Sequence, residues 1–138
     1  MTDMIEVRVS NLIGAALDWA IASAECGGVL IYPEGGQFPP AGSVSFNDDD
    51  LTLWLNDGER GEESWSPSTD WGQGGLLIDK YHGTTEYNPG RPADLCYTGG
   101  PAGAGVWCYG PTALTAFCRG LVNHKLGDTV QVPKELMP

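Results

Sequence analysis

The chain has 138 residues, which suits one domain with a modest core and is too short for two independent domains. Its 18 acidic residues against 7 Lys and Arg give a formal net charge of -11 at pH 7, which opposes binding to duplex nucleic acid or to an anionic membrane. A content of 20 glycines and 10 prolines predicts many turns and long connections. We therefore expect a single domain over residues 1–138.

The N-terminal residues 1–9 lack the basic region and apolar run of a secretory signal, and no apolar stretch is long enough to span a membrane. A cytosolic protein is therefore predicted. No two cysteines form a CxxC pair, and neither His82 nor His124 stands at metal-finger spacing from one. In a reducing compartment this pattern favours buried thiols over a disulfide or a metal site, at Cys26, Cys96, Cys108 and Cys118. No cofactor or metal is predicted.

The first 32 residues predict a strand, a helix and a second strand. Apolar and charged residues alternate over residues 5–9, as in a half-buried strand. Ser10 or Asn11 is then expected to cap a helix whose apolar residues recur at three- and four-residue spacing up to a Cys-Gly-Gly stop. Trp19 lies off the centre of its apolar stripe and is expected at a groove or a partner surface. Residues 29–32 form the next apolar run.

A loop rich in proline and glycine is predicted over residues 33–42, followed by strands around Val44–Phe46 and Leu51–Leu55. The acidic run Asp48–Asp50 between them is predicted to be a solvated hairpin turn. Because it lacks the alternating oxygen ligands and terminal glutamate of an EF-hand, a calcium loop is the less favoured interpretation.

Residues 65–75 predict a shaped loop, with Pro67 restricting the backbone and three glycines permitting sharp turns. A short strand is expected at Leu76–Ile78, and an irregular region over 80–109 with a possible strand at 106–109. A second helix is expected from the Gly-Pro-Thr at 110–112 to Gly127, with His124 and Lys125 in its last turn, before a terminal strand at 130–132.

Together these elements predict an α+β fold: a twisted, mainly antiparallel sheet with the two helices packed together on one face. The central loop is expected at an edge or end of the sheet. The alanine-rich first helix would allow close packing between copies, so a homodimer or higher homo-oligomer is favoured.

Three sequence blocks, in their order and spacing, resemble the NinX-like family of small uncharacterised phage proteins. They cover residues 17–25, residues 66–75, and residues 110–116 continuing to 125–128. The central Pro-Ser-Thr-Asp-Trp run is the most specific of them. The resemblance implies a phage or prophage origin and an accessory role in the cytoplasm of the infected bacterium. It supplies no established reaction.

The central loop has two interpretations. In the structural one, both indoles fill the core and the hydroxyls and carboxylate bind nearby backbone. In the functional one, the loop walls a pocket in which aromatic faces stack a planar ring, polar groups bind its edges, and an arginine neutralises a phosphate. The predicted ligand-binding residues are Trp65, Ser68, Thr69, Asp70, Trp71, Gln73, Gly74, Arg91, Trp107 and Arg119.

Three functions follow as hypotheses. The first is a phage accessory protein that captures a small polar or nucleotide-like ligand, with a host immune signal among the candidates, and does not transform it. The second is an acidic protein-interaction module that inhibits a basic host or phage protein. The third, ranked last, is a hydrolase that uses Asp70 with His82.

Overall fold

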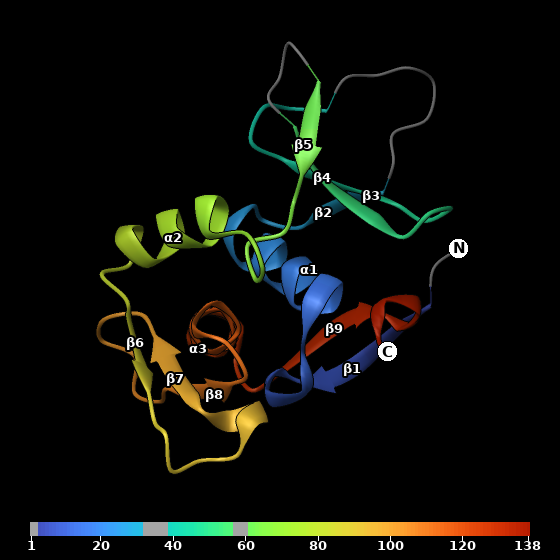
Figure 1. Cartoon of the computed structure of the whole chain (residues 1–138). Helices are drawn as coiled ribbons and strands as arrows, with labels where there is room; N and C mark the ends of the chain where they lie inside the picture. The colour runs from blue at the N-terminus through green and yellow to red at the C-terminus, as the bar shows by residue number, and fades with distance from the viewer. Residues whose placement is uncertain (1–2, 32–38, 57–60) are drawn as a thin grey trace.

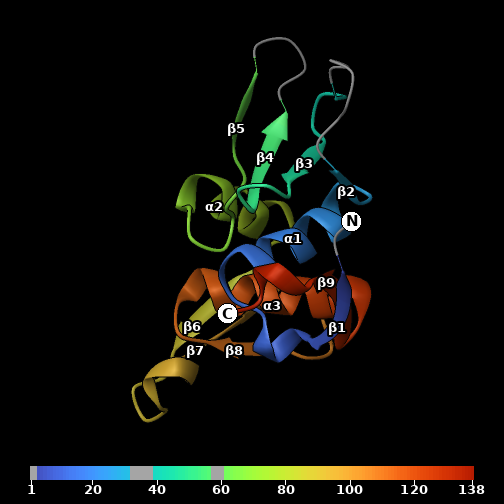
Figure 2. The ribbon, with the colours of Figure 1, turned by 90° about the vertical axis from the view of Figure 1, so that its right-hand side faces the viewer.

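The computed structural model describes residues 3–31, 39–56 and 61–138, and places a layer of helices between two small sheets (Figure 1). The turned view in Figure 2 shows the same layers, with the four-stranded sheet on one side of the helices and the three-stranded sheet on the other. The helices are α1 (Gly14–Glu25), α2 (Trp71–Lys80) and α3 (Ala113–Leu126).

The strands of the described residues fall into three separate sheets. The four-stranded sheet contains β2 (Val29–Ile31), β3 (Val44–Asn47), β4 (Thr52–Asn56) and β5 (Glu62–Ser64). The three-stranded sheet contains β6 (Thr84–Tyr87), β7 (Tyr97–Gly100) and β8 (Cys108–Gly110). A two-stranded ribbon pairs β1 (Met4–Arg8) with β9 (Thr129–Pro133).

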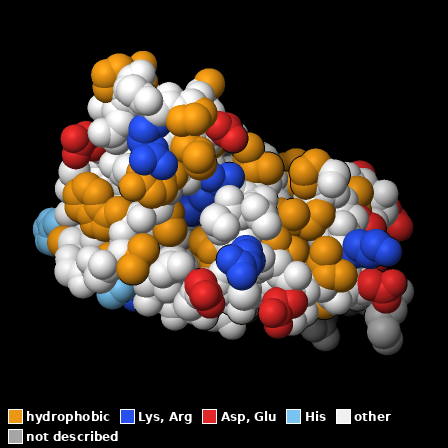
Figure 3. Space-filling view, turned by 90° about the horizontal axis from the view of Figure 1, so that it is seen from below, with side chains coloured by type: hydrophobic (Ala, Val, Ile, Leu, Met, Phe, Trp, Pro, Cys, Tyr) orange, Lys and Arg blue, Asp and Glu red, His pale blue; other side chains and the backbone are white. Residues whose placement is uncertain are grey.

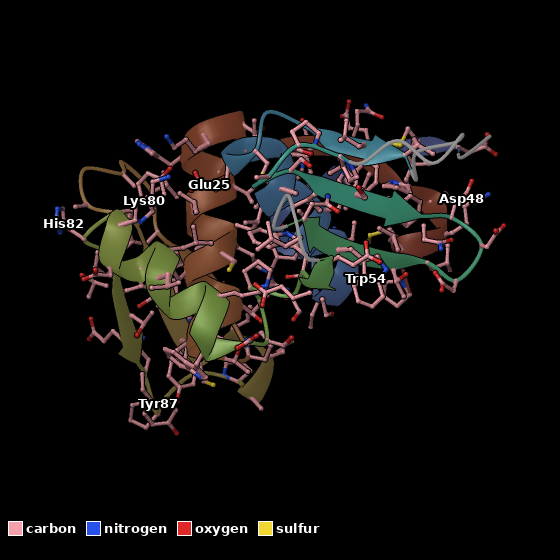
Figure 4. The ribbon with its side chains drawn as sticks, turned by 90° about the horizontal axis from the view of Figure 1, so that it is seen from above. Glu25, Asp48, Trp54, Lys80, His82 and Tyr87 are labelled. Atoms are coloured by element: carbon pink, nitrogen blue, oxygen red, sulfur yellow. The ribbon has the colours of Figure 1, made fainter. Side chains whose placement is uncertain are left out.

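Among the described residues, every strand pair is antiparallel except β2 with β3. The predicted α+β class with mainly antiparallel pairing is therefore confirmed. The hairpin β3–β4 turns through the exposed aspartates 48–50, as predicted, and Figure 4 shows Asp48 at the outer end of this hairpin. Most of the proline- and glycine-rich stretch lies outside the described residues, as does Tyr32.

The core lies where α1 and α3 pack against each other. Both helices contribute fully buried aliphatic side chains, and Phe117 of α3 is among the largest buried residues. On the other side of α1, Trp19 meets Phe46 of β3 edge to face, with ring centroids 5.2 Å apart. These contacts bind the four-stranded sheet to the helical layer.

The backbone of α3 lies directly on the three-stranded sheet. A Cβ atom added at Gly120 would lie 2.6 Å from Gly100 Cα, and one added at Gly99 would lie 2.8 Å from Phe117 N. Glycine at both positions allows the helix and strand β7 to approach this closely. The side chain of Thr112 caps α3 by accepting the Thr115 N–H at 3.1 Å, and Gly127 ends the helix as predicted.

The predicted start of the first helix is wrong. Ser10 and Asn11 lie in a short 3-10 turn (Val9–Asn11), and no side chain caps α1, which follows the extended Ile13. Periodicity located the helix correctly, whereas the choice of cap depended on backbone geometry that the apolar pattern does not report.

The largest correction concerns residues 71–78. The predicted loop ends at Asp70, and both Trp71–Gly75 and the expected strand Leu76–Ile78 belong to helix α2. Three glycines, each of which costs about 1 kcal/mol in a helix, masked the helical pattern. The helix begins because the Asp70 carboxylate accepts the Gly72 N–H at 2.8 Å, and it persists because Gly74 and Leu77 pack inward.

The region predicted as irregular contains two further strands, β6 and β7, which pair with each other, and β7 also pairs with β8. Both strands have only four residues, and two of the four in β7 are glycines, so neither gave a clear strand pattern. The arrangement of both predicted helices on one face of a single sheet is not confirmed. Instead α3 packs on the three-stranded sheet, while α1 contacts β2, β4 and β9.

We expect Gly74→Ala to lower the free energy of unfolding by about 3 kcal/mol, because the new methyl group would collide with the Pro67 carbonyl oxygen and lie 2.7 Å from Leu114 Cδ2. Gly75→Ala is the matched control. Its methyl group would meet only Trp71 Cε3, at 4.0 Å, and should stabilise α2 by up to about 1 kcal/mol. Chemical denaturation of both variants measures the difference, and equal effects would contradict this packing.

Candidate functional site

The central loop is held from within by helix α1. Asp18 Oδ1 accepts the backbone N–H of Ser68 at 2.8 Å, and the Asp18 carbonyl oxygen accepts the indole N–H of Trp65 at 2.9 Å. The Ser68 hydroxyl also donates to the Gly14 carbonyl, at 3.4 Å. Trp65 and Ser68 are both buried. Two of the predicted ligand-binding residues are therefore parts of the interior.

Helix α3 holds the same loop from the other side. The Cys118 thiol donates to the Pro67 carbonyl at 3.8 Å, and Leu114 packs against Gly74. The three blocks singled out in the sequence thus meet at this loop: the first through Asp18, the second as the loop itself, and the third through α3. For Trp65 and Ser68 the structural interpretation of the loop holds.

The polar residues of the loop bind its own backbone. Gln73 Oε1 accepts the Ser66 N–H at 2.7 Å, and Gln73 Nε2 donates to the Ser64 carbonyl at 2.7 Å. The Asp70 side chain caps α2. Thr69 is exposed, and its hydroxyl donates to the Ser66 carbonyl oxygen at 3.4 Å. These bonds shape the turn and use the groups expected to bind a ligand.

Trp71 behaves differently from Trp65. Its side chain is 60% exposed at the first position of α2, and Leu76, five residues later, is 70% exposed. Neither residue contributes to the core cluster. The outward face of α2 therefore presents two large apolar side chains to solvent.

A second group of predicted residues meets around Tyr109 of strand β8. The Arg91 guanidinium stacks over the Tyr109 ring with its central carbon 3.8 Å from the centroid. Arg119 Nη1 donates to the Tyr109 carbonyl at 2.8 Å. Trp107 lies two residues earlier on the chain, against Gly100 of the neighbouring strand. We call the set Arg91, Trp107, Tyr109 and Arg119 the Tyr109 face.

Sequence reasoning missed Tyr109. The signal was its two-residue spacing from Trp107, since residues i and i+2 of a strand share a face. Trp107 is 39% and Tyr109 40% exposed, and Val106 beside them is also exposed. Figure 3 shows hydrophobic and cationic side chains next to one another on the underside of the molecule, over the end where the three-stranded sheet lies.

Arg119 is a cation withdrawn from solvent. It is only 6% exposed, and its Nε donates to the Leu12 carbonyl at 2.8 Å. Burial lowers its pKa, against the opposing influence of Cys108 and Asp94 nearby. The ion pair found among the described residues joins Lys80 to Glu25 at 3.0 Å, so within that part of the chain no carboxylate pairs with Arg119 (Figure 4). Its charge is balanced by carbonyl dipoles.

The hollows found among the described residues lie elsewhere. One of about 420 Å³ adjoins β9, and one of about 260 Å³ is lined by Gly42 and by paired residues of β4 and β5. Neither is lined by a predicted ligand-binding residue. Within the described residues, the central loop therefore walls neither hollow.

The structure also bears on chemistry. Asp70 precedes α2 and His82 follows it, so the length of this helix, about 15 Å, separates them. The pair considered for hydrolysis therefore does not meet. Figure 4 shows His82 beyond the end of α2 that carries Lys80.

All four cysteines are free, with Cys118 buried and the others half-buried. Residues 3–31, 39–56 and 61–138 contain no cluster of three or more His, Cys, Asp or Glu fit to hold a metal ion. In the same residues no helix is long and apolar enough to cross a membrane.

The profile of the family described as Bacteriophage P22, NinX matches residues 8–125. The chain belongs to this NinX family. No curated protein matches it. The matched segment contains α1, α2 and all of α3 except Leu126, together with the central loop and the Tyr109 face, whereas β9 and all of β1 except Arg8 lie outside it. The resemblance noted in the sequence is confirmed, and with it the bacteriophage affiliation.

The buried carboxyl group of Asp18 has a raised pKa. Burial raises the pKa of Asp18 from 3.8 to about 6, while the hydrogen bonds from Ser68 oppose the shift. The folded state therefore holds the Asp18 proton more tightly than the unfolded state does. Its contribution to stability is full below about pH 4 and is lost as the pH rises through about 6.

We expect the wild type to lose up to about 3 kcal/mol of unfolding free energy between pH 4 and pH 7 relative to Asp18→Asn, which keeps an oxygen acceptor for Ser68 but cannot ionise. Asp18→Ala should be less stable than Asp18→Asn at every pH, by about 1–3 kcal/mol, because it leaves the buried Ser68 N–H without a partner. Urea denaturation across this range tests both. Parallel pH profiles for the wild type and Asp18→Asn would show that Asp18 is not the group responsible.

Proposed function

We propose that this NinX-family protein binds a small planar anionic ligand of the nucleotide class on the Tyr109 face, without transforming it. The observation that carries the proposal is the pair of guanidinium groups, Arg91 and Arg119, that both contact Tyr109 beside an exposed indole. Three of the ten predicted ligand-binding residues belong to this group.

The first supporting argument is electrostatic. A chain of net charge -11 repels an anion unless positive charge is concentrated locally. Two of its 7 basic residues contact Tyr109, and Arg119 has no carboxylate partner among the described residues. A guanidinium with little solvent around it interacts strongly with an incoming phosphate, because its charge is poorly screened.

The second argument concerns shape and aromatic surface. Trp107 directly precedes β8 and Tyr109 lies within it, and each leaves about two-fifths of its surface open, which suits stacking of a purine or pyrimidine ring. Arg91 already covers the Tyr109 ring, so Trp107 is the residue we expect to stack the base. Arg91 then lies where it can turn toward a phosphate.

The absence of a transformation is supported by the neighbouring groups. Cys108 is the nucleophilic side chain closest in sequence to Tyr109, and burial raises the pKa of its thiol. A protonated thiol is a poor nucleophile. Asp94 influences Arg119, but no histidine of the described chain joins this group. The surroundings therefore suit capture better than hydrolysis.

Isothermal titration calorimetry with cyclic nucleotides and ADP-ribose-type nucleotides tests the proposal. We expect Arg91→Ala to weaken binding at least about tenfold, from loss of a charge-assisted contact, and Trp107→Leu to weaken it by a similar factor. Trp71→Ala is the control for loss of an exposed aromatic side chain outside the Tyr109 face. Arg8→Ala is the control for loss of a positive charge outside it. Both should bind as the wild type does.

The absence of binding across this panel would refute the proposal. A loss confined to Trp71→Ala would place the ligand at the start of α2 instead. Unchanged thermal unfolding of each variant is required, and it separates a lost contact from a lost fold.

The interaction-module hypothesis is favoured by a different observation, the exposed Trp71 and Leu76 on the outward face of α2. Tryptophan at such a position is typical of interface hot spots. Host-lysate capture at low and high salt, with Trp71→Ala beside the wild type, addresses it. The homo-oligomeric state and the host-cytoplasmic location also stay predictions.

A further inference from the structure

The ribbon β1–β9 has an edge next to an apolar hollow. Antiparallel register pairs Ile5 with Val132 and Val7 with Val130. The hydrogen bonds that continue this ladder, Val9 N–H to the Asp128 carbonyl at 2.9 Å and Lys134 N–H to the Asp3 carbonyl at 2.8 Å, fix its phase. Every second residue pair, from Asp3 to Val9, is therefore the hydrogen-bonded one.

It follows that Thr129 and Gln131 direct their backbone N–H and C=O groups away from β1, toward the other edge of β9. Among the described residues no backbone hydrogen bond reaches these groups outside the ladder. Pro133, the next residue in this phase, has no N–H to offer. The edge of β9 thus presents unused pairing groups at two alternate residues, which is a template for another strand.

The hollow of about 420 Å³ runs along this edge. Thr129, Val130 and Gln131 of β9 line it, and so do Met4 and Glu6 of β1, which share one face of the ribbon with Thr129 and Gln131; the hollow therefore extends from the edge of β9 over that face. Trp19 and Ser23 of α1 line it from the helical layer. Figure 1 agrees, since β9 lies between α1 and β1. Trp19 thus lines this hollow, as predicted for a groove, but it is only 6% exposed and packs on Phe46 as part of the core.

The chemistry of the lining limits what can enter. Trp19, Val130, Met4 and Leu126 supply apolar surface, and Glu6 is the one charged residue among those that line the hollow. The ribbon also belongs to a chain of net charge -11. An acidic occupant is opposed, whereas an extended segment with apolar and basic side chains in alternation complements both features.

We propose that the edge of β9 receives an extended segment of a partner protein as a third strand, with an apolar side chain in the hollow and a Lys or Arg beside Glu6. A second copy of this chain is disfavoured as the occupant, because pairing the two β9 edges would bring together two strongly acidic chains and their Glu6 side chains. This site is separate from the Tyr109 face and does not depend on it.

The probe is an acetylated synthetic peptide of about seven residues that alternates valine and lysine, a usual strand length. Amide hydrogen exchange of the wild-type protein is measured with and without it. We expect exchange at Thr129 and Gln131 to slow at least about tenfold when the peptide is saturating, because both N–H groups become bonded. The same peptide with glutamate in place of lysine should give no protection.

Two variants locate the contact. Gln131→Pro removes the edge N–H, which the ladder to β1 does not use, and should abolish peptide binding; Gln131→Ala keeps that N–H and should bind as the wild type does. Glu6→Gln should weaken binding about threefold or more, with a shallower salt dependence. Thermal unfolding of each variant reports whether the ribbon is intact, and the exchange experiment needs no variant.

Absence of protection by the valine–lysine peptide would overturn the proposal. Equal protection by the glutamate peptide would overturn its charge argument, and with it the stated partner. Protection that instead rises with protein concentration in the absence of peptide, together with dimer mass in sedimentation, would assign the edge to a second copy and contradict the proposal.

Discussion

The structure depends on one buried carboxyl group. Asp18 uses its side chain and its carbonyl to hold two residues that lie about fifty positions further along the chain, Ser68 and Trp65. Burying an ionised carboxylate costs free energy unless hydrogen bonds compensate for the lost water. The pKa of Asp18 is raised for this reason. These two hydrogen bonds from Asp18 orient the loop so that Asp70 can begin α2, and α2 in turn packs on α3 through Gly74. Long-range polar contacts therefore position a helix that has little intrinsic stability of its own.

Arg119 plays a comparable part on the other side of α3. Its two donors reach the Leu12 carbonyl before α1 and the Tyr109 carbonyl in β8, so it joins the start of the first helix to the three-stranded sheet. Within the part of the chain that the structure describes, this cation forms no ion pair with a carboxylate, and it belongs to the Tyr109 face. In the proposed function, a residue that stabilises the fold also contributes positive charge for an anion, and substitutions at Arg91 and Trp107 leave its structural contacts in place.

The sequence predicted the parts of the fold that repeat along the chain. Periodicity located α1 and α3, alternation located β1, and the acidic turn located the β3–β4 hairpin. It could not predict α2, whose three glycines oppose a helix and whose stability comes from Asp70 and from packing on α3. It likewise could not reveal that Trp65 is buried and Trp71 exposed, because both indoles stand in similar local sequence. Their difference arises from Asp18, which is distant in the chain. In the sequence, Arg91 and Arg119 stand out by their charge alone, and it is the packing of α3 and the preceding loop around β8 that brings both to Tyr109.

The indole N–H signals of the 5 tryptophans in a two-dimensional nitrogen–proton NMR spectrum test this account most directly. It predicts that the Trp65 signal exchanges slowly with solvent, because that N–H is buried and bonded to the Asp18 carbonyl, whereas the Trp71 and Trp107 signals exchange fast. When a bound nucleotide is present, the Trp107 signal should move and those of Trp65 and Trp71 should stay in place. Fast exchange at Trp65 would contradict the hydrogen bonding of the loop to Asp18. A nucleotide-induced shift at Trp65 with none at Trp107 would contradict the assignment of binding to the Tyr109 face.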